Sequence, residues 1–253
     1  MIDRHRIARR ALGALVLAAA TSGAPAGPRS AETTLEDALA RADSVVGAAY
    51  AAMGPAEARG AIASVTARAR AHGPSGTYEM VVRAAAGGRV HMEQRPEQGN
   101  AFIGVLNGPH AWTRGTHGLE RLERDVAAMV RSHAFQWTAL HVRDFFSELS
   151  LEGEASFAGR RCYRLRGLDD LEMPCAIYFD TETHLLAGFE IADAIEEGTV
   201  VVRFAQWRRV GGVLLPSEVL ATDADGDFVL DFHAITLNDV DDALFEVPEA
   251  LRR

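Results

Sequence analysis

Hydrophobic residues recur at helical spacing in the first part of the chain and at every second position afterwards. From Thr34, a good N-cap residue, apolar side chains three and four residues apart predict a helix that ends at Gly54. Pro55 suits the start of a second, short helix. From Ile62 the alternation predicts strands, with one interruption. The apolar positions of the first helix are Leu35, Ala38, Leu39, Ala42, Val45, Val46 and Ala49, and the strands after the first are predicted at 77–84, 89–94, 101–106, 110–114, 151–157, 161–167, 175–180, 185–191, 199–209, 213–222 and 227–237.

Short connections rich in glycine indicate that these strands form antiparallel hairpins. Gly87-Gly88 and Asn107-Gly108 are typical of tight hairpin turns, and the Gly-Pro-Ser-Gly stretch at 73–76 supplies another. About eleven or twelve strands are too many for a small flat sheet, so we expect a mainly β fold in which the sheet is strongly curled. The interruption, at residues 120–146, predicts a helix and a second helical segment with apolar positions Leu122, Val126, Met129, Val130, Trp137, Leu140 and Phe145.

Residues 1–26 have the organisation of a secretory signal peptide. A cluster of four arginines precedes an apolar run at 11–20, and small residues then lead to a cleavage site near Gly27. The run has roughly half of the ~20 residues that a membrane span requires. We therefore expect residues 27–253 to be a single soluble domain in the periplasm. An uncleaved interfacial anchor is the alternative, and Arg9-Arg10 leaves both general secretion and twin-arginine export open.

The charge balance argues against nucleic acid as a partner. The 253 residues carry a formal net charge of −9, and loss of residues 1–26 removes four arginines and Asp3, which changes it to −12. A surface of that sign repels phosphate backbones and anionic membrane faces. The apolar content of 48% is enough for one sizeable core, and we expect a monomer.

Cys162 and Cys175 are the only two cysteines, and they flank a predicted hairpin. If the turn centres near residues 168–169, the two side chains face each other at a separation that a disulfide spans. Closing so short a loop would stabilise the fold by roughly 3 kcal/mol. The alternative is a pair of small buried thiols.

No motif indicates catalysis or metal binding, so we expect a protein that is not an enzyme and uses no cofactor. The most metal-like string, at 223–227, lacks the glycine of a calcium loop at its sixth position and has Ala234 where the loop needs a glutamate, so a hairpin turn explains it better. The histidines lack metal-ligand spacing, and nucleophile signatures of hydrolases are absent from the sequence.

Large apolar side chains exceed what a plain sheet requires. Most of them would form core, but a strongly curled sheet cannot fill its own concavity, so a helix or a ligand must cover the remainder. We expect the helical segment within residues 120–146 to lie over the concave face as a movable lid. The predicted ligand-binding residues of this hollow and lid are Phe102, Trp112, Val126, Met129, Val130, Trp137, Phe145 and Trp207.

Several short stretches match the pattern of one protein family, and they are spread over nearly the whole of residues 27–253. They are Ala51-Ala52-Met53-Gly54, Ala61-Ile62-Ala63-Ser64, Tyr178-Phe179-Asp180 with Thr181-Glu182-Thr183, Phe204 with Gly212-Val213-Leu214-Leu215-Pro216, and Ile235-Thr236-Leu237-Asn238 with Phe245-Glu246-Val247-Pro248. In these the chain resembles the LolA-like outer-membrane lipoprotein carrier and sorting proteins. The resemblance implies an unclosed antiparallel β-barrel wrapped around helical segments, with acyl chains held in the apolar hollow.

Our leading hypothesis is a periplasmic protein that binds or carries a lipid or a lipoprotein acyl chain. The resemblance also implies membrane-associated transport partners. Two alternatives remain open: a structural or regulatory module whose helices fill the hollow permanently, and a hydrolase with an unrecognised site. A filled or an empty hollow would separate the first of these from a carrier, and a pocket of converging carboxylates with a histidine would favour the second.

The predicted signal peptide can be tested by the N-terminus and the location of the native protein. The native protein should begin near Gly27 and fractionate with the periplasm, because the apolar run is too short to remain as a membrane span. Mass measurement of the chain purified from its own cells would check this. An intact N-terminus combined with membrane retention would show that the segment is an anchor instead.

Overall fold

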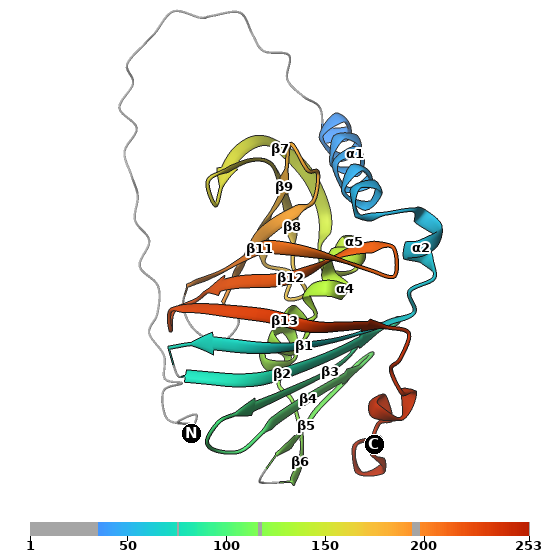
Figure 1. The fold of residues 1–253 in the computed structure, drawn as a ribbon, viewed down its shortest axis with the longest axis vertical. Coiled ribbons are helices and arrows are strands. Elements are labelled where there is room, and N and C mark those ends of the chain that lie inside the picture. Colours follow the sequence, from blue (N-terminus) through green and yellow to red (C-terminus); the bar gives the residue numbers. More distant parts are fainter. Residues whose placement is uncertain (1–34, 75, 116–117, 194–197, 253) are drawn as a thin grey trace, which may run out of the picture. The chain divides into compact units, whose positions relative to one another are not determined.

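The computed structural model describes residues 35–74, 76–115, 118–193 and 198–252, and the predicted signal peptide lies outside them. In this part of the chain, thirteen strands form one antiparallel sheet in the order β6-β5-β4-β3-β2-β1-β13-β12-β11-β10-β9-β8-β7 (Figure 1). β6 and β7 are the two edges and do not pair with each other, so the sheet is not closed. The strands are β1 (Ser64–Gly73), β2 (Gly76–Ala85), β3 (Arg89–Pro96), β4 (Phe102–Asn107), β5 (His110–Gly115), β6 (Gly118–Arg121), β7 (Ser147–Phe157), β8 (Arg160–Leu168), β9 (Pro174–Asp180), β10 (Leu186–Ala192), β11 (Thr199–Val210), β12 (Val213–Thr222) and β13 (Asp227–Leu237).

The helices lie where the apolar spacing predicts them, except that the segment at 120–146 contains one helix more than predicted. The first helix, predicted from Thr34 to Gly54, is described from Leu35, and it buries Ala42 and Val46 along one face. The segment at 120–146 holds three short helices instead of two, because the chain breaks at Ala134 and at His141. The described helices are α1 (Leu35–Met53), α2 (Ala56–Gly60), α3 (Arg124–Ser132), α4 (Phe135–Leu140) and α5 (Val142–Phe145), followed near the C-terminus by the 3-10 turns η1 (Asp242–Phe245) and η2 (Glu249–Leu251).

The predicted hairpins are confirmed. Gly87 and Gly88 both have positive φ, which glycine adopts without strain, and Ala85 pairs directly with Arg89 across the turn. Asp223 and Gly226 exchange two backbone hydrogen bonds, so the acidic string at 223–227 is the turn between β12 and β13. The thirteenth strand, β6, has only four residues and was not predicted, because so short a run carries little alternation.

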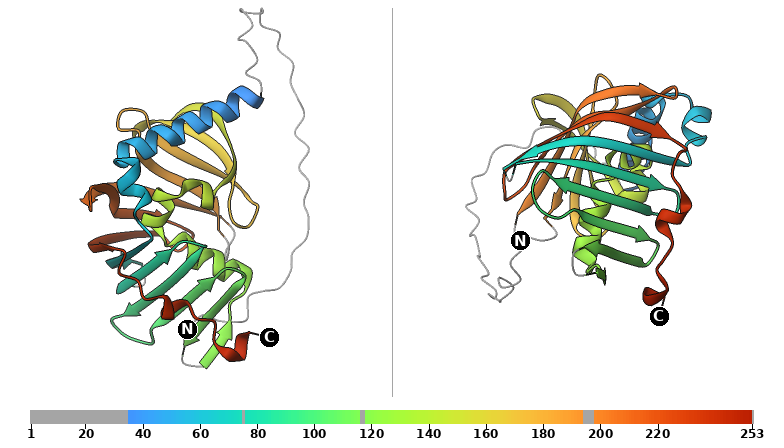
Figure 2. Two further views of the ribbon diagram at one scale, coloured as in Figure 1. Left: turned by 90° about the vertical axis from the view of Figure 1, so that its right-hand side faces the viewer. Right: turned by 60° about the horizontal axis from the view of Figure 1, so that its bottom comes forward.

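Alternating side chains divide the buried residues between the two faces of the sheet. Along β9, Ile177 and Phe179 belong to the main hydrophobic cluster, whereas Ala176 and Tyr178 belong to a smaller cluster with Phe157. A third cluster joins Trp112 and Val105 to Phe245 of η1. The strands change direction progressively across the sheet, as the two views of Figure 2 make clear.

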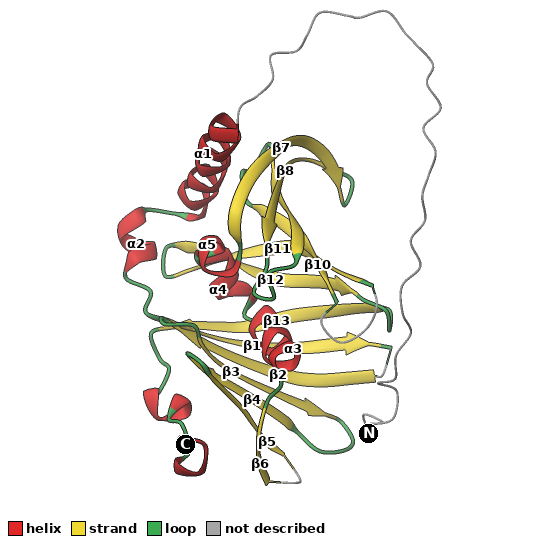
Figure 3. Ribbon diagram, turned by 180° about the vertical axis from the view of Figure 1, so that it is seen from behind, coloured by secondary structure: helices red, strands yellow, loops and turns green. Residues whose placement is uncertain are grey.

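The helices pack on the sheet face that carries the main cluster. α1 contacts β7 and β12, α3 contacts β3 and β4, and α4 contacts β12 and β1. Figure 3 shows α3, α4 and α5 in front of the strands. All six residues of α4 are buried, whereas Val130 is the only fully buried residue of α3. Within the described residues, therefore, α4 is core and α3 is a surface element.

The predicted pairing of the two cysteines is wrong. In the β8–β9 hairpin Cys162 pairs with Asp180 and Cys175 pairs with Gly167, so the cysteines lie five positions apart in register. An odd offset places side chains on opposite faces of a sheet. Cys175 accordingly belongs to the main cluster and Cys162 to the smaller one, and both are free thiols. The turn lies at residues 169–173, further along the chain than the predicted 168–169.

Both cysteines should therefore be free thiols, and in the unfolded protein both should be fully labelled without any reductant. In the folded protein they should react slowly, because burial raises the pKa of Cys175 to about 12 and also raises that of Cys162, and the thiolate is the reactive form. Iodoacetamide mass labelling with and without denaturant measures both states. A non-reduced peptide joining residues 162 and 175 would contradict the register.

Candidate ligand-binding site

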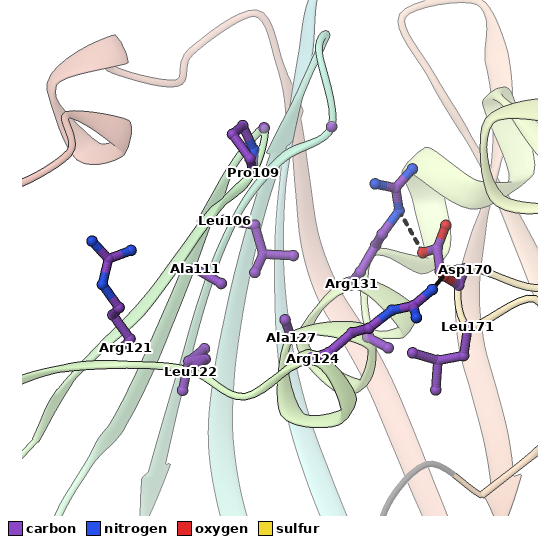
Figure 4. Close-up of a pocket in the computed structure, with 13 residues that line it drawn as sticks. Leu106, Pro109, Ala111, Arg121, Leu122, Arg124, Ala127, Arg131, Asp170 and Leu171 are labelled. Carbon is purple, nitrogen blue, oxygen red and sulfur yellow. Dashed lines mark hydrogen bonds and ion pairs between the residues drawn. The ribbon is translucent and has the colours of Figure 1, made fainter. Parts of the chain in front are cut away.

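A cavity of about 380 Å³ lies between α3, the strands β4–β6 and the loop that joins β8 to β9. Its floor is apolar and comes from the sheet and from the inner side of α3. Three arginines and one aspartate stand around this floor (Figure 4). The residues that line the cavity are Gly88, Leu106, Gly108, Pro109, Ala111, Arg121, Leu122, Arg124, Ala127, Ala128, Arg131, Asp170 and Leu171.

The helix α3 begins and ends where local chemistry allows. Glu123 is extended and precedes the first turn, in which the Asp125 carboxylate accepts a hydrogen bond from the backbone N–H of Val126. At the C-terminal end the carbonyl of Met129 accepts hydrogen bonds from Ser132 Oγ, at 2.8 Å, and from His133 Nδ1, at 2.8 Å. These side chains satisfy the backbone groups that a helix end leaves open.

A glycine lets α3 approach the sheet. Val130 is completely buried against β4, and a Cβ added at Gly104 would stand 2.6 Å from Val130 Cγ2. That distance is well inside van der Waals contact, so only glycine leaves room for the valine. The contact between Gly104 and Val130 therefore sets the distance between α3 and β4.

Arg131 ties the end of α3 to two other parts of the chain. Its Nε lies 2.7 Å from Asp170 Oδ2 in the β8–β9 loop, and Nη2 donates a hydrogen bond of 2.8 Å to the carbonyl of Asp144. The guanidinium also stands 4.8 Å from the ring centre of Phe145, a cation–π distance. Burial raises the pKa of Asp170, because the desolvation of its carboxylate outweighs the opposing effect of Arg131.

The other two arginines are held less tightly or from a different side. Arg124 Nη2 lies 3.4 Å from the carbonyl of Asp170 and 4.0 Å from Glu172 Oε1, and 69% of its side chain is exposed. Arg121 donates a hydrogen bond of 2.7 Å to the carbonyl of Leu251 in the C-terminal segment. In Figure 4, Arg121 stands on one side of the apolar floor, and Arg124, Arg131 and Asp170 stand on the other.

The predicted ligand residues are not all brought together. Val130, Trp137 and Phe145 are buried in the main cluster, and Phe102, Met129 and Trp207 are half-buried against it. Val126 is half-buried on α3. Trp112 lies in the cluster under Phe245, apart from the others.

Trp137 lies in a part of the predicted lid that is fixed core. The Phe135 ring meets those of Phe204 and Phe232 edge to face, at 6.3 and 6.2 Å, and Gln136 Nε2 donates a buried hydrogen bond of 3.0 Å to the carbonyl of Pro216. The structure thus divides the predicted lid into a locked part, α4 with α5, and the half-buried helix α3.

The two histidines of this segment offer no metal site. Desolvation lowers the pKa of His133 and of His141, so both imidazoles are neutral near pH 7. His133 is already hydrogen-bonded to the Met129 carbonyl, and the His141 ring lies 4.2 Å from that of Trp137, tilted by 33°. No cluster of three metal-binding side chains occurs among the residues that the structure describes.

The charged residues of the cavity are not among the predicted ligand-binding residues. Arg124 and Arg131 are seven residues apart, which puts them on one face of a helix, and this spacing is visible in the sequence. Asp170 and Arg121 carry no such signal, because they reach the cavity from a loop and an edge strand that are distant in the chain.

Known structures share this fold at low sequence identity. A LolA superfamily protein of Nitrosomonas europaea is similar with a TM-score of 0.57 and 16% identity, over 81% of this chain and 97% of that one. An outer-membrane lipoprotein-sorting protein domain of Vibrio parahaemolyticus matches with a TM-score of 0.55 and 11% identity, over the same 81% and 97%. No family model and no curated protein matches the chain. The predicted resemblance is confirmed at the level of the fold: the chain has the LolA-like fold.

The Gly104–Val130 contact can be tested by substitution. Gly104→Ala should destabilise the protein by about 1–3 kcal/mol, because the new methyl group overpacks the space under α3. Adding Val130→Ala should relieve part of this, so the double variant should lose less stability than the sum of the two single variants. Urea unfolding measures all three free energies.

Gly47→Ala is the matched control for this series. Gly47 lies in α1 with no atom within 4 Å of the added Cβ, so the substitution should be neutral or stabilising by up to ~1 kcal/mol. Strict additivity of Gly104→Ala and Val130→Ala would mean that the two residues do not meet.

Proposed function

We propose that the protein is a periplasmic carrier that binds the acyl chain of a lipid or lipoprotein in the cavity beneath α3. The observation that carries this proposal is the cavity itself, whose apolar floor is formed by Leu106, Ala111, Leu122 and, on the half-buried helix α3, Ala127. Its volume of about 380 Å³ lies within the roughly 300–1,000 Å³ range of ligand pockets. The LolA-like fold supports the proposal as an analogy, since fold alone does not fix function.

In this proposal the curled sheet wraps around the helical segments, and α3 is the part that moves. Of its residues only Val130 is fully buried, whereas all of α4 is buried. Local opening costs least where few apolar contacts are lost. Movement of α3 would break the Arg131–Asp170 ion pair and the contact at Gly104, and it would leave the aromatic packing around Phe135 unchanged.

Burial of an acyl chain supplies enough free energy for binding. Each methylene group transferred from water to an apolar site contributes ~0.8 kcal/mol. Association and the ordering of side chains oppose this by several kcal/mol. A chain of moderate length exceeds that cost, so the affinity should depend on how many carbons the cavity accepts.

The alternative of a structural module rests on the complete burial of α4. Phe135, Trp137 and Leu140 occupy the same face of the sheet that a carrier would leave open to a ligand. If α3 is equally immobile, the helices fill the hollow permanently and no ligand enters. The cavity also argues for binding over catalysis, because its described lining residues include one carboxylate, Asp170, and no histidine.

As a carrier in the periplasm, the protein would act as a monomer and would work with membrane-associated partners. None of the helices that the structure describes combines the length and the apolar character needed to cross a membrane.

Affinity should rise with acyl-chain length and then level off. Each added methylene should tighten binding by up to roughly fourfold until the cavity is full. Titration calorimetry of the delipidated full chain with saturated acyl probes of increasing length, below their micelle concentrations, measures the series. Weak binding that does not change with length would refute the carrier proposal and favour the structural module.

A cavity-filling variant locates the site in the same series. Ala127→Leu places three more carbons on the cavity floor, so the affinity should level off at a shorter chain. Ala40→Leu is the control, because Ala40 is exposed on α1 and the same substitution there adds bulk without touching the cavity. Equal curves for the two variants would place the acyl site elsewhere.

A further inference from the structure

The cavity joins an apolar floor to an excess of positive charge. Arg121, Arg124 and Arg131 line it against a single carboxylate, Asp170. This excess stands out in a chain whose formal net charge is −9. A cleft with low-dielectric walls strengthens the field of the charges that line it.

The arginines differ in how many close contacts their side chains make. Arg131 is occupied by Asp170, by the Asp144 carbonyl and by the Phe145 ring. Among the residues that the structure describes, Arg124 makes only the long contacts of 3.4 and 4.0 Å, and most of its side chain faces solvent. Arg124 can therefore turn toward a ligand at the mouth of the cavity without breaking a strong bond.

We infer that the cargo is a single-chain amphiphile with an anionic head, a carboxylate or a phosphate, whose head binds at Arg124 beside Arg131 and whose chain lies on the floor between α3 and β4–β5. Guanidinium groups bind carboxylates and phosphates through two parallel hydrogen bonds, in bidentate geometry. A volume of about 380 Å³ is at the small end of ligand pockets, which favours one chain over two or three. This inference rests on the proposed function, because it names the class of amphiphile for the same cavity.

The test compares probes that share one chain and differ in the head. Dodecanoate and dodecyl phosphate should bind the full-length delipidated protein about tenfold or more tightly than dodecanol or dodecyltrimethylammonium, since hydrogen bonds between charged groups are stronger than neutral ones. The preference should shrink as salt is raised. Inorganic phosphate and butanoate, which carry the charge without the twelve-carbon chain, should bind far more weakly than dodecyl phosphate and dodecanoate.

Variants assign the preference to the cavity. Arg124→Gln should remove about tenfold of the preference for the anionic head and leave the affinity for dodecanol unchanged, and Arg124→Lys should restore part of it. Arg70→Gln is the matched control, because Arg70 is similarly exposed and paired with Glu79 on the β1–β2 hairpin, outside the cavity. Thermal melting verifies that the variants remain folded.

The outcomes separate this inference from the proposed function. Equal affinity for all four heads, or an unchanged preference in Arg124→Gln, would overturn the anionic-head inference while the carrier remains. Inorganic phosphate binding as tightly as dodecyl phosphate would reduce the cavity to a simple anion site and overturn the amphiphile. No binding of any probe would overturn the carrier proposal together with the inference.

Discussion

The packing of Phe135 against Phe204 and Phe232 is the contact on which the arrangement of the site depends. It joins α4 to β11 and β13, and the buried bond from Gln136 to the Pro216 carbonyl adds β12. An unclosed sheet of thirteen strands, counted over the described residues, needs elements that cover its apolar face. Because α4 is wholly buried there, it holds the C-terminal end of α3 against the sheet.

The helix α3 is consequently anchored at both ends and lightly held between them. On one side the chain leaves the edge strand β6, and on the other it enters α4. Between these points the helix is held by the buried Val130 and by the contacts of Arg131 with Asp170, the Asp144 carbonyl and the Phe145 ring. A desolvated carboxylate such as Asp170, whose pKa burial raises, gains less from its arginine than an ideal pair would. Buried contacts are thus concentrated in α4, and α3 has fewer of them.

The sequence predicts the strands well because each hairpin is encoded locally, by alternation and by turn residues such as Gly87-Gly88. It fails on the cysteines because the β8–β9 turn is set by a side chain: Asp169 Oδ1 accepts hydrogen bonds from the N–H groups of Leu171 and Met173, which moves the turn along the chain. A shift by an odd number of residues then exchanges the faces. The charged residues of the cavity cannot be predicted from the sequence as one group, because they come from α3, β6 and this loop, which are distant in the chain. Only the helical spacing of Arg124 and Arg131 is apparent in the sequence.

Under the proposed function, affinity and selectivity come from different parts of one cavity. A net charge of −9 repels anions at a distance, but salt at physiological concentration limits that repulsion to about 8 Å. Within that range the guanidinium groups at the cavity act on a ligand directly. The apolar floor supplies free energy in proportion to chain length, whatever the head. The arginines therefore decide which amphiphile is chosen, and the floor and α3 decide how long it stays.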